Sequence, residues 1–164
     1  MLHEMEVAGL ALDPSNNTPI LVLKSLDGEQ TLPIWIGLLE AASIAMALQN
    51  VEFSRPMTHD LFKNFVDTLE ISVARVEVVD LQESTFFARI YFNAESGAFS
   101  LDARPSDAIA IALRTKSPIF AEEAVITKST AAGPAVAEDD SEEGKKWAEY
   151  LEKLNPDDFG KYKM

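Results

Sequence analysis

Two short segments of the chain combine residue types that bind phosphate or move protons. They are Arg55-Pro56-Met57-Thr58-His59-Asp60 and Asp102-Ala103-Arg104-Pro105-Ser106-Asp107. Each places Arg before Pro, then a hydroxyl residue and then Asp, which is typical of a helix start. Pro fits the first turn, Ser or Thr can cap free N–H groups, and Asp matches the positive end of the helix dipole. The two arginines oppose that dipole, so each is expected to have an anionic partner. That partner is either a nearby carboxylate, such as Asp102 or Glu40, or a ligand phosphate.

Two further features bear on this chemistry. His59 could act as a general base near neutral pH, or it could be an ordinary histidine near a helix start. Glu40 comes early in an otherwise apolar segment, where it either matches a helix dipole or serves as a metal ligand. Carboxylates that hold Mg²⁺ or Mn²⁺ could activate water and offset charge on a phosphate. The sequence has no Walker loop or HExxH motif, so the cofactor is unknown and a divalent cation is an expectation only.

The elements that position these residues follow from hydrophobic periodicity and turn residues. Strands are predicted over 5–12, 19–25 and 31–36, followed by a helix over 38–49. A helix over 58–69, strands over 71–81, 85–93 and 98–103, and a helix over 105–115 come next. This order predicts an α+β fold in which a mixed or antiparallel sheet carries packed helices.

An internal similarity runs through these elements. Ile44-Ala45-Met46-Ala47-Leu48 matches Ile109-Ala110-Ile111-Ala112-Leu113 at an offset of 65, and at the same offset 21–24 falls on 86–89. The match indicates a duplicated βββα unit. The alternative is that two alanine-rich helices look alike by composition alone.

The chain divides by composition into three parts. A domain is predicted over 1–128, an acidic flexible linker over 129–144, and an amphipathic helix with a tail over 145–164. The apolar residues Trp147, Tyr150, Leu151 and Leu154 form one face of that C-terminal helix. A short amphipathic helix needs a surface to pack on, so it is expected to dock on the domain or on a second copy. We expect a homo-oligomer, most simply a dimer.

Charge and cysteine content exclude several classes of protein. The 164 residues include 14 basic and 27 acidic ones, and the first 130 alone hold 18 acidic and 9 basic residues. This charge balance argues against avid, non-specific coating of nucleic acid but not against a weak, local nucleic-acid site. The absence of cysteine excludes disulfides, thiolate metal sites and cysteine nucleophiles. No apolar run is long enough to cross a membrane and no signal peptide is evident, so no membrane association and a cytoplasmic location are expected.

Aromatic residues cluster in the predicted strand over 85–93. Phe86, Phe87, Tyr91 and Phe92 could form a base-stacking platform, although core packing is the favoured interpretation.

Four segments in order carry a family resemblance. They are Gly9-Leu10-Ala11-Leu12-Asp13-Pro14, Leu32-Pro33-Ile34-Trp35-Ile36-Gly37, Arg55-Pro56-Met57-Thr58-His59-Asp60-Leu61 and Asp102-Ala103-Arg104-Pro105-Ser106-Asp107-Ala108-Ile109-Ala110. Across 5–126 the chain resembles the bifunctional nuclease domain, a small bacterial and plant domain. The closing Leu154-Asn155-Pro156-Asp157-Asp158-Phe159 is similar to the tail of stand-alone bacterial members. The resemblance implies nuclease activity on both RNA and DNA.

The leading hypothesis is therefore a nuclease that hydrolyses phosphodiester bonds with the help of a metal ion. The expected catalytic residues, with His59 as the base, are His59, Asp60, Asp102 and Asp107. The expected substrate-binding residues are Arg55, Arg104, Ser106 and Thr58. The expected metal ligands are Glu40 and Asp107.

Two rival functions remain open at this stage. One is a non-catalytic regulatory module that binds an anion or a protein, favoured by the acidic composition, the single usable histidine and the lack of a tight metal motif. The other is a mainly structural oligomer.

Overall fold

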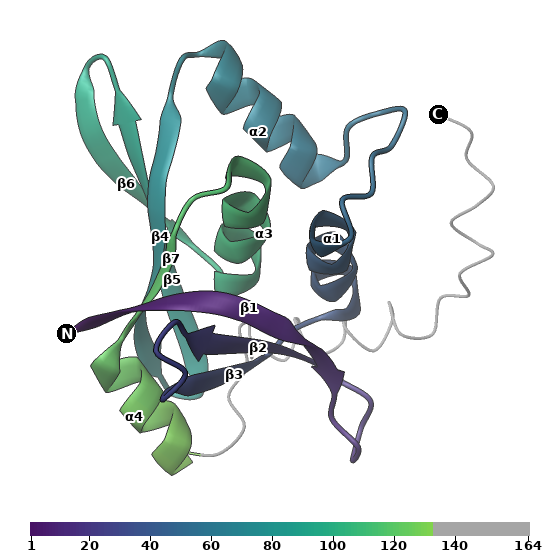
Figure 1. Ribbon diagram of the computed structural model, residues 1–164, viewed down its shortest axis with the longest axis vertical. Helices are drawn as coiled ribbons and strands as arrows, with labels where there is room; N and C mark the ends of the chain where they lie inside the picture. The colour runs from purple at the N-terminus through teal and green to yellow at the C-terminus, as the bar shows by residue number, and fades with distance from the viewer. Residues whose placement is uncertain (133–164) are drawn as a thin grey trace.

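A computed structural model describes residues 1–132 of the chain (Figure 1). The strands are β1 (Leu2–Leu12), β2 (Pro19–Ser25), β3 (Thr31–Trp35), β4 (Ser72–Gln82), β5 (Thr85–Ala94), β6 (Gly97–Ala103) and β7 (Ile119–Glu122). The helices are α1 (Leu38–Leu48), α2 (Thr58–Thr68), α3 (Pro105–Thr115) and α4 (Glu123–Ala132). Helix α4 covers the first four positions of the expected linker. The rest of that linker and the helix expected after it, over 133–164, lie outside the described residues.

Within the described residues, seven strands form one mixed sheet in the order β3-β2-β1-β7-β4-β5-β6. Neighbouring strands are antiparallel, except that β4 and β7 run parallel. Each half of the sheet is an antiparallel three-strand meander, and the short strand β7 joins the two halves. The α+β class predicted from the sequence is confirmed.

The arrangement agrees with a duplicated βββα unit. The segments that match at an offset of 65 residues fall on β2 and β5, the middle strands of the two meanders, and on α1 and α3. Helices α1 and α3 pack against each other. The second unit differs because α2 is inserted before its first strand.

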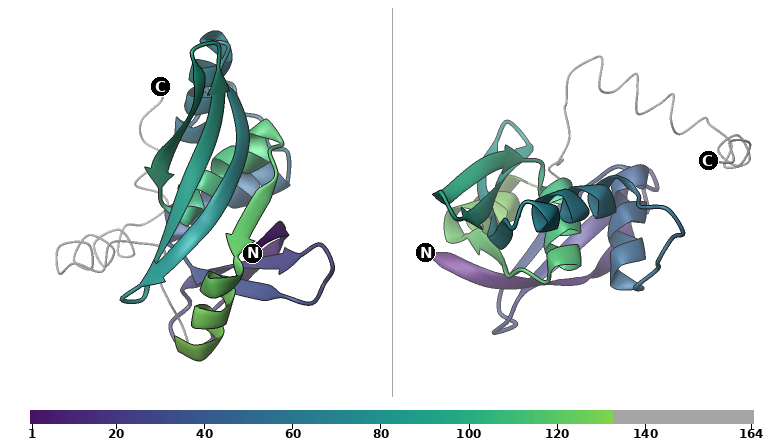
Figure 2. Two further views of the ribbon diagram at one scale, coloured as in Figure 1. Left: turned by 90° about the vertical axis from the view of Figure 1, so that its left-hand side faces the viewer. Right: turned by 90° about the horizontal axis from the view of Figure 1, so that it is seen from above.

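Three helices cover one face of the strongly twisted sheet (Figure 1). Helix α3 lies between α1 and α2, contacts both, and packs on β4 and β5. Helix α4 packs against β3, β4 and β7 on the other side of the sheet, as the turned views also show (Figure 2). The three helices therefore meet one another above the sheet.

Helix α3 is the centre of the core. Its residues 105, 106 and 108–112 are buried, and Ile109 is completely covered. A helix that is apolar on nearly every side must be buried on nearly every side. The charged side chains of α3 and of its N-cap residue consequently lie on one narrow stripe, which faces the neighbouring helices.

Strand β5 shows how the sheet separates two faces. Phe86 and Phe92 are buried, and Phe92 approaches Phe62 of α2 with 6.3 Å between ring centroids. Side chains alternate along a strand, so Phe87 and Tyr91 lie on the opposite face, where they are half-buried. The expectation of core packing is confirmed for Phe86 and Phe92. Phe87 and Tyr91 lie outside the main core.

No helix among residues 1–132 is long and apolar enough to cross a membrane.

Candidate active site

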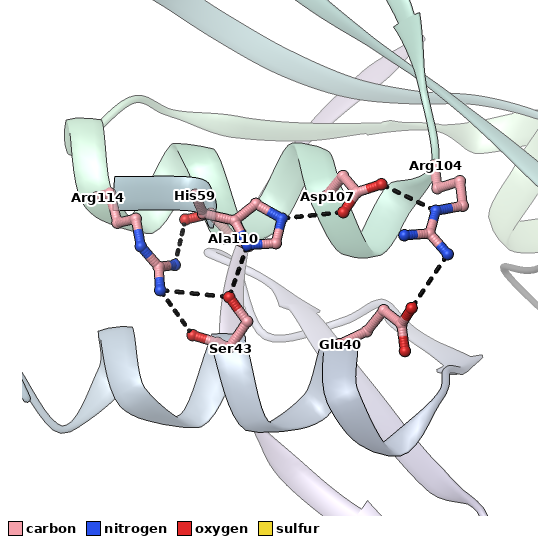
Figure 3. Close-up of polar contacts among 7 residues, drawn as sticks. All are labelled: Glu40, Ser43, His59, Arg104, Asp107, Ala110 and Arg114. Carbon is pink, nitrogen blue, oxygen red and sulfur yellow. Dashed lines mark hydrogen bonds and ion pairs between the residues drawn. The ribbon is translucent and has the colours of Figure 1, made fainter. Parts of the chain in front are cut away.

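The polar stripe of α3 consists of Arg104, Asp107 and Arg114. Arg104 is the N-cap residue, and the other two follow three and ten positions later. At 3.6 residues per turn these spacings place all three on one side of the helix. That side faces α1 and α2, so the stripe meets the polar residues that those helices present (Figure 3).

His59, the second residue of α2, connects all three helices. Its Nε2 atom lies 2.9 Å from Oδ1 of Asp107 on α3, and its Nδ1 atom lies 2.8 Å from Oγ of Ser43 on α1. Both ring nitrogens are thus engaged, one by a carboxylate and one by a hydroxyl group (Figure 3). The row Ser43–His59–Asp107 is a hydroxyl–imidazole–carboxylate arrangement of the kind used in nucleophilic catalysis.

Arg104 extends this row on its far side. Its Nε donates to Oδ2 of Asp107 over 2.8 Å, and its Nη1 donates to Oε1 of Glu40 over 3.1 Å. The expectation that Arg104 pairs with a nearby carboxylate is therefore confirmed for Glu40, and Asp107 is a second partner. The Arg104 side chain remains 46% exposed, so it borders solvent.

Arg114 closes the row at the other end. Its Nε lies 2.7 Å from Oδ1 of Asp60, and Nη1 donates to the carbonyl of Ala110 over 2.9 Å. Its Nη2 donates to both the carbonyl oxygen and Oγ of Ser43, over 3.1 and 3.2 Å. The side chain is only 9% exposed. Arg114 therefore ties α3 to α1 and to α2.

Two carboxylates of the site, Asp107 and Asp60, are held in their ionised form. Burial acts to raise the pKa of Asp107, but the hydrogen bonds from His59 and Arg104 outweigh it and hold that pKa below its usual value. Burial also acts to raise the pKa of Asp60, and the hydrogen bonds from Arg114 and a backbone N–H group again bring it below the usual value. Burial tends to lower the pKa of Arg104, whereas its two carboxylate partners raise it.

The ionisation of Asp107 fixes the proton on His59. An ionised carboxylate can only accept hydrogen bonds, so the Nε2 atom of His59 must donate to it. In the neutral ring the Nδ1 atom then carries the lone pair and accepts the hydroxyl proton of Ser43. This is the tautomer that a proton-accepting histidine requires.

The structure brings together five of the residues that the sequence singled out, namely His59, Asp60, Asp107, Arg104 and Glu40. The sequence patterns missed Ser43 and Arg114, which complete the network. The available signals were weak: a hydroxyl residue in an alanine-rich helix, and a basic residue seven positions after Asp107 on the same helix face.

Asp102 and Arg55, which were expected in the site, do not join the cluster. Asp102 pairs with Arg89 across the β5–β6 ladder, and Arg89 donates to Oγ of Ser100. These side chains share the sheet face opposite to Phe92 and the helices, so Asp102 points away from His59. Arg55 is exposed in the loop before α2 and makes no hydrogen bond or ion pair within residues 1–132.

The expected capping role of the hydroxyl residues is wrong. The N-cap positions are Met57 and Arg104, so Thr58 and Ser106 already lie inside their helices. Asp60 does cap its helix, because Oδ2 accepts from the N–H group of Met57 over 3.1 Å. Ser106 is 1% exposed, and its Oγ has no hydrogen-bond partner in the described part of the chain, so it cannot contact a substrate in this arrangement.

A resident metal ion does not fit the described residues. Residues 1–132 contain no group of three or more His, Cys, Asp or Glu side chains arranged to hold a metal. The two expected ligands, Glu40 and Asp107, are instead bridged by Arg104. A cationic side chain therefore occupies the position between the carboxylates.

Comparisons with known proteins point to one family. The family model described as the bifunctional nuclease domain matches residues 21–133. An uncharacterised protein of Mycobacterium tuberculosis is 40% identical over 164 residues, which is 96% of this chain and 98% of that protein.

Plant relatives match a shorter region. Bifunctional nuclease 1 of Arabidopsis thaliana is 35% identical over 105 residues, 62% of this chain and 32% of the plant protein. Bifunctional nuclease 2 of Oryza sativa subsp. japonica is 30% identical over 115 residues, 68% of this chain and 35% of the plant protein. The matched parts are thus about a third of each plant protein.

Proposed function

Because the chain belongs to the bifunctional nuclease domain family, we propose that it hydrolyses phosphodiester bonds of RNA and DNA where α1, α2 and α3 meet. The observation that carries the proposal is the row of hydrogen bonds from Ser43 through His59 to Asp107, with an arginine at each end. Phosphodiester hydrolysis needs a group that removes a proton from the attacking oxygen and cations that offset charge on the phosphate. The row offers both.

Each residue of the row has a distinct role in the proposed reaction. His59 accepts the proton that the attacking oxygen loses and returns it to the leaving oxygen. Asp107 holds the ring in the tautomer that can accept that proton, and it stabilises the imidazolium that forms. Arg104 contacts the phosphate from the solvent side. Arg55, four residues before His59 in the loop that leads into α2, supplies a second contact to the nucleic-acid backbone.

The remaining charged residues position this machinery. Asp60 and Arg114 join the start of α2 to α3, and Glu40 orients Arg104. The cluster of Glu40, Asp60 and Asp107 with the two arginines carries one more negative than positive charge while His59 is neutral. A site with net negative charge repels a polyanion overall, so binding through its arginines is expected to be weak, local and sensitive to salt.

The test is cleavage of short, fluorescently labelled single-stranded RNA and DNA by the purified full chain. His59→Ala and Asp107→Asn are each expected to slow cleavage by at least about 100-fold. Asp102→Asn is the matched control, because it changes the same residue type on the opposite face of the sheet and should leave the rate unchanged. Parallel reactions with Mg²⁺, with Mn²⁺ or with a chelator distinguish a metal-assisted reaction, as predicted from the sequence, from one performed by the side chains alone.

Two results would contradict the proposal. Cleavage by His59→Ala at the wild-type rate would show that this row does not perform the reaction. A rise in melting temperature with oligonucleotide but no cleavage would favour the alternative, a non-catalytic module that binds anions.

A further inference from the structure

We infer that Ser43 is the nucleophile of this site and that cleavage passes through a covalent phosphoryl–Ser43 intermediate. The choice of a phosphodiester as substrate rests on the proposed function. The identity of the nucleophile rests on the hydrogen bonds around His59.

The hydrogen bonds of His59 determine which proton it can remove. Its Nε2–H group donates to the carboxylate of Asp107, so only the lone pair of Nδ1 can act as a base. Among the described residues, the group that faces Nδ1 is the hydroxyl of Ser43, at 2.8 Å. A water molecule could reach that lone pair only by displacing the serine. The proton in position for removal is therefore the one on Ser43.

The Oγ atom of Ser43 keeps one lone pair available for attack. Its proton points to His59, and one of its two lone pairs accepts from Nη2 of Arg114 over 3.2 Å. The other lone pair is left for attack on phosphorus. The buried guanidinium group stabilises the negative charge that develops on Oγ as the proton leaves, and a cation does so more strongly where water is largely excluded.

The position of Ser43 within its helix supports the same inference. A serine in the middle of a helix commonly bonds back to a carbonyl oxygen one turn earlier. Ser43, the sixth residue of α1, instead directs its hydroxyl across to α2. The residue is half-buried rather than enclosed, and the side chains of His59 and Asp107 are 17% and 30% exposed. A phosphate can therefore approach the row from solvent, alongside Arg104.

The covalent steps balance in atoms and charge. Oγ of Ser43 attacks phosphorus, its proton passes to Nδ1 of His59, and the bond from phosphorus to the leaving nucleoside oxygen breaks. That oxygen takes the proton from Nδ1. A water molecule then attacks the phosphoryl–serine and gives a proton to Nδ1. The bond from phosphorus to Oγ breaks, and Oγ recovers its proton from His59.

The test uses diisopropyl fluorophosphate, a phosphorus ester that reacts with activated serines and releases fluoride. Mass spectrometry of the treated full chain is expected to locate the adduct on Ser43. The labelling rate should fall at least about 100-fold in His59→Ala, and the adduct should be absent in Ser43→Ala. Ser100→Ala is the control, because Ser100 lies on the opposite face of the sheet and its loss should leave labelling unchanged. Thermal melts establish that each variant is folded.

The outcomes separate this inference from the proposed function. Labelling at Ser43 that depends on His59, together with loss of cleavage in Ser43→Ala, supports both. Labelling at Ser43 without any cleavage by the wild-type protein supports the nucleophile and overturns the nuclease substrate. Cleavage by Ser43→Ala at the wild-type rate overturns the nucleophile and leaves the nuclease intact. A wild-type protein that cleaves but is never labelled also overturns the inference, because Ser43 then only orients His59.

Discussion

Arg114 provides the most direct test of how the site is held together. We consider Arg114→Met, which keeps much of the apolar stem and removes the guanidinium group. The change deletes the ion pair to Asp60 and the hydrogen bonds to Ser43 and to the carbonyl of Ala110. Ser43 lies on α1 and Asp60 on α2, so the substitution removes one polar link from α3 to each of these helices, while His59–Asp107 and Arg104–Glu40 remain.

The structure sets the size of the expected effect. Removing one partner of a buried ion pair costs about 3–5 kcal/mol. Asp60 is 36% exposed, so water can partly solvate the carboxylate that is left behind, and the lower end of that range applies. We therefore expect a loss of about 3 kcal/mol in the free energy of unfolding, which corresponds to a fall of about 10 °C in melting temperature for a chain of this size.

The assay is urea unfolding of the full chain at pH 7, followed by far-ultraviolet circular dichroism. Lys63→Met is the matched control, because Lys63 forms an ion pair with Asp67 within α2 and the two side chains are 37% and 51% exposed. An exposed pair of this type contributes about 0.3–0.5 kcal/mol. A double-mutant cycle of Arg114→Met with Asp60→Asn should give a coupling energy of about 1–3 kcal/mol.

The coupling between Arg114 and Asp60 also depends on pH. The pKa of Asp60 is lower in the folded protein than its usual value, so its contribution to stability is present above that usual value. The contribution is lost as the pH falls through the folded pKa. An Arg114→Met protein that is as stable as the wild type, or a Lys63→Met protein that is destabilised equally, would refute this account of the three-helix junction.

Three further predictions address other parts of the molecule. Hydrogen bonds from Gln82 and Lys128 hold the pKa of Asp80 at about 2 rather than 3.8. The deficit in melting temperature of Asp80→Asn should therefore be constant from about pH 7 to 5, decline as the pH falls further and vanish below about pH 2. A deficit that grows on acidification would contradict this assignment. Ile109 is fully buried in α3. Measured by urea unfolding, Ile109→Ala should therefore lower the free energy of unfolding by about 2–5 kcal/mol and Ile109→Val by about 0.5–1.5 kcal/mol. Equal losses in the two variants would exclude a cavity as the cause. Arg55 is exposed and unpaired within residues 1–132, so Arg55→Ala should leave the melting temperature unchanged. The substitution should raise KM for an oligonucleotide and reduce the salt slope of binding by about 1. An unchanged KM would show that this residue does not contact the nucleic acid.

Local rules explain most of what could be predicted from the chain. Within residues 1–132, the boundaries of the three predicted helices and six predicted strands follow from apolar spacing and turn residues, which act over a few positions. Strand β7 escaped prediction because four residues carry too little periodicity, and it exists through its pairing with β1 and β4. Helix α4 escaped because small residues near its end are equally typical of a linker.

The sequence by itself determined the α+β class and most of the elements, and it singled out five residues that lie together in the candidate site. Pro, Asp and His near a helix start have recognisable local preferences. Only the tertiary structure decided which of these residues meet. His59 and Asp107 are 48 positions apart, and Arg114 and Ser43 are 71 apart, so their contacts depend on how three helices pack above one sheet. The same packing brought in Ser43, left Arg55 in a loop, and placed Asp102 on the opposite face, because side chains alternate along a strand and a single position decides between the two faces.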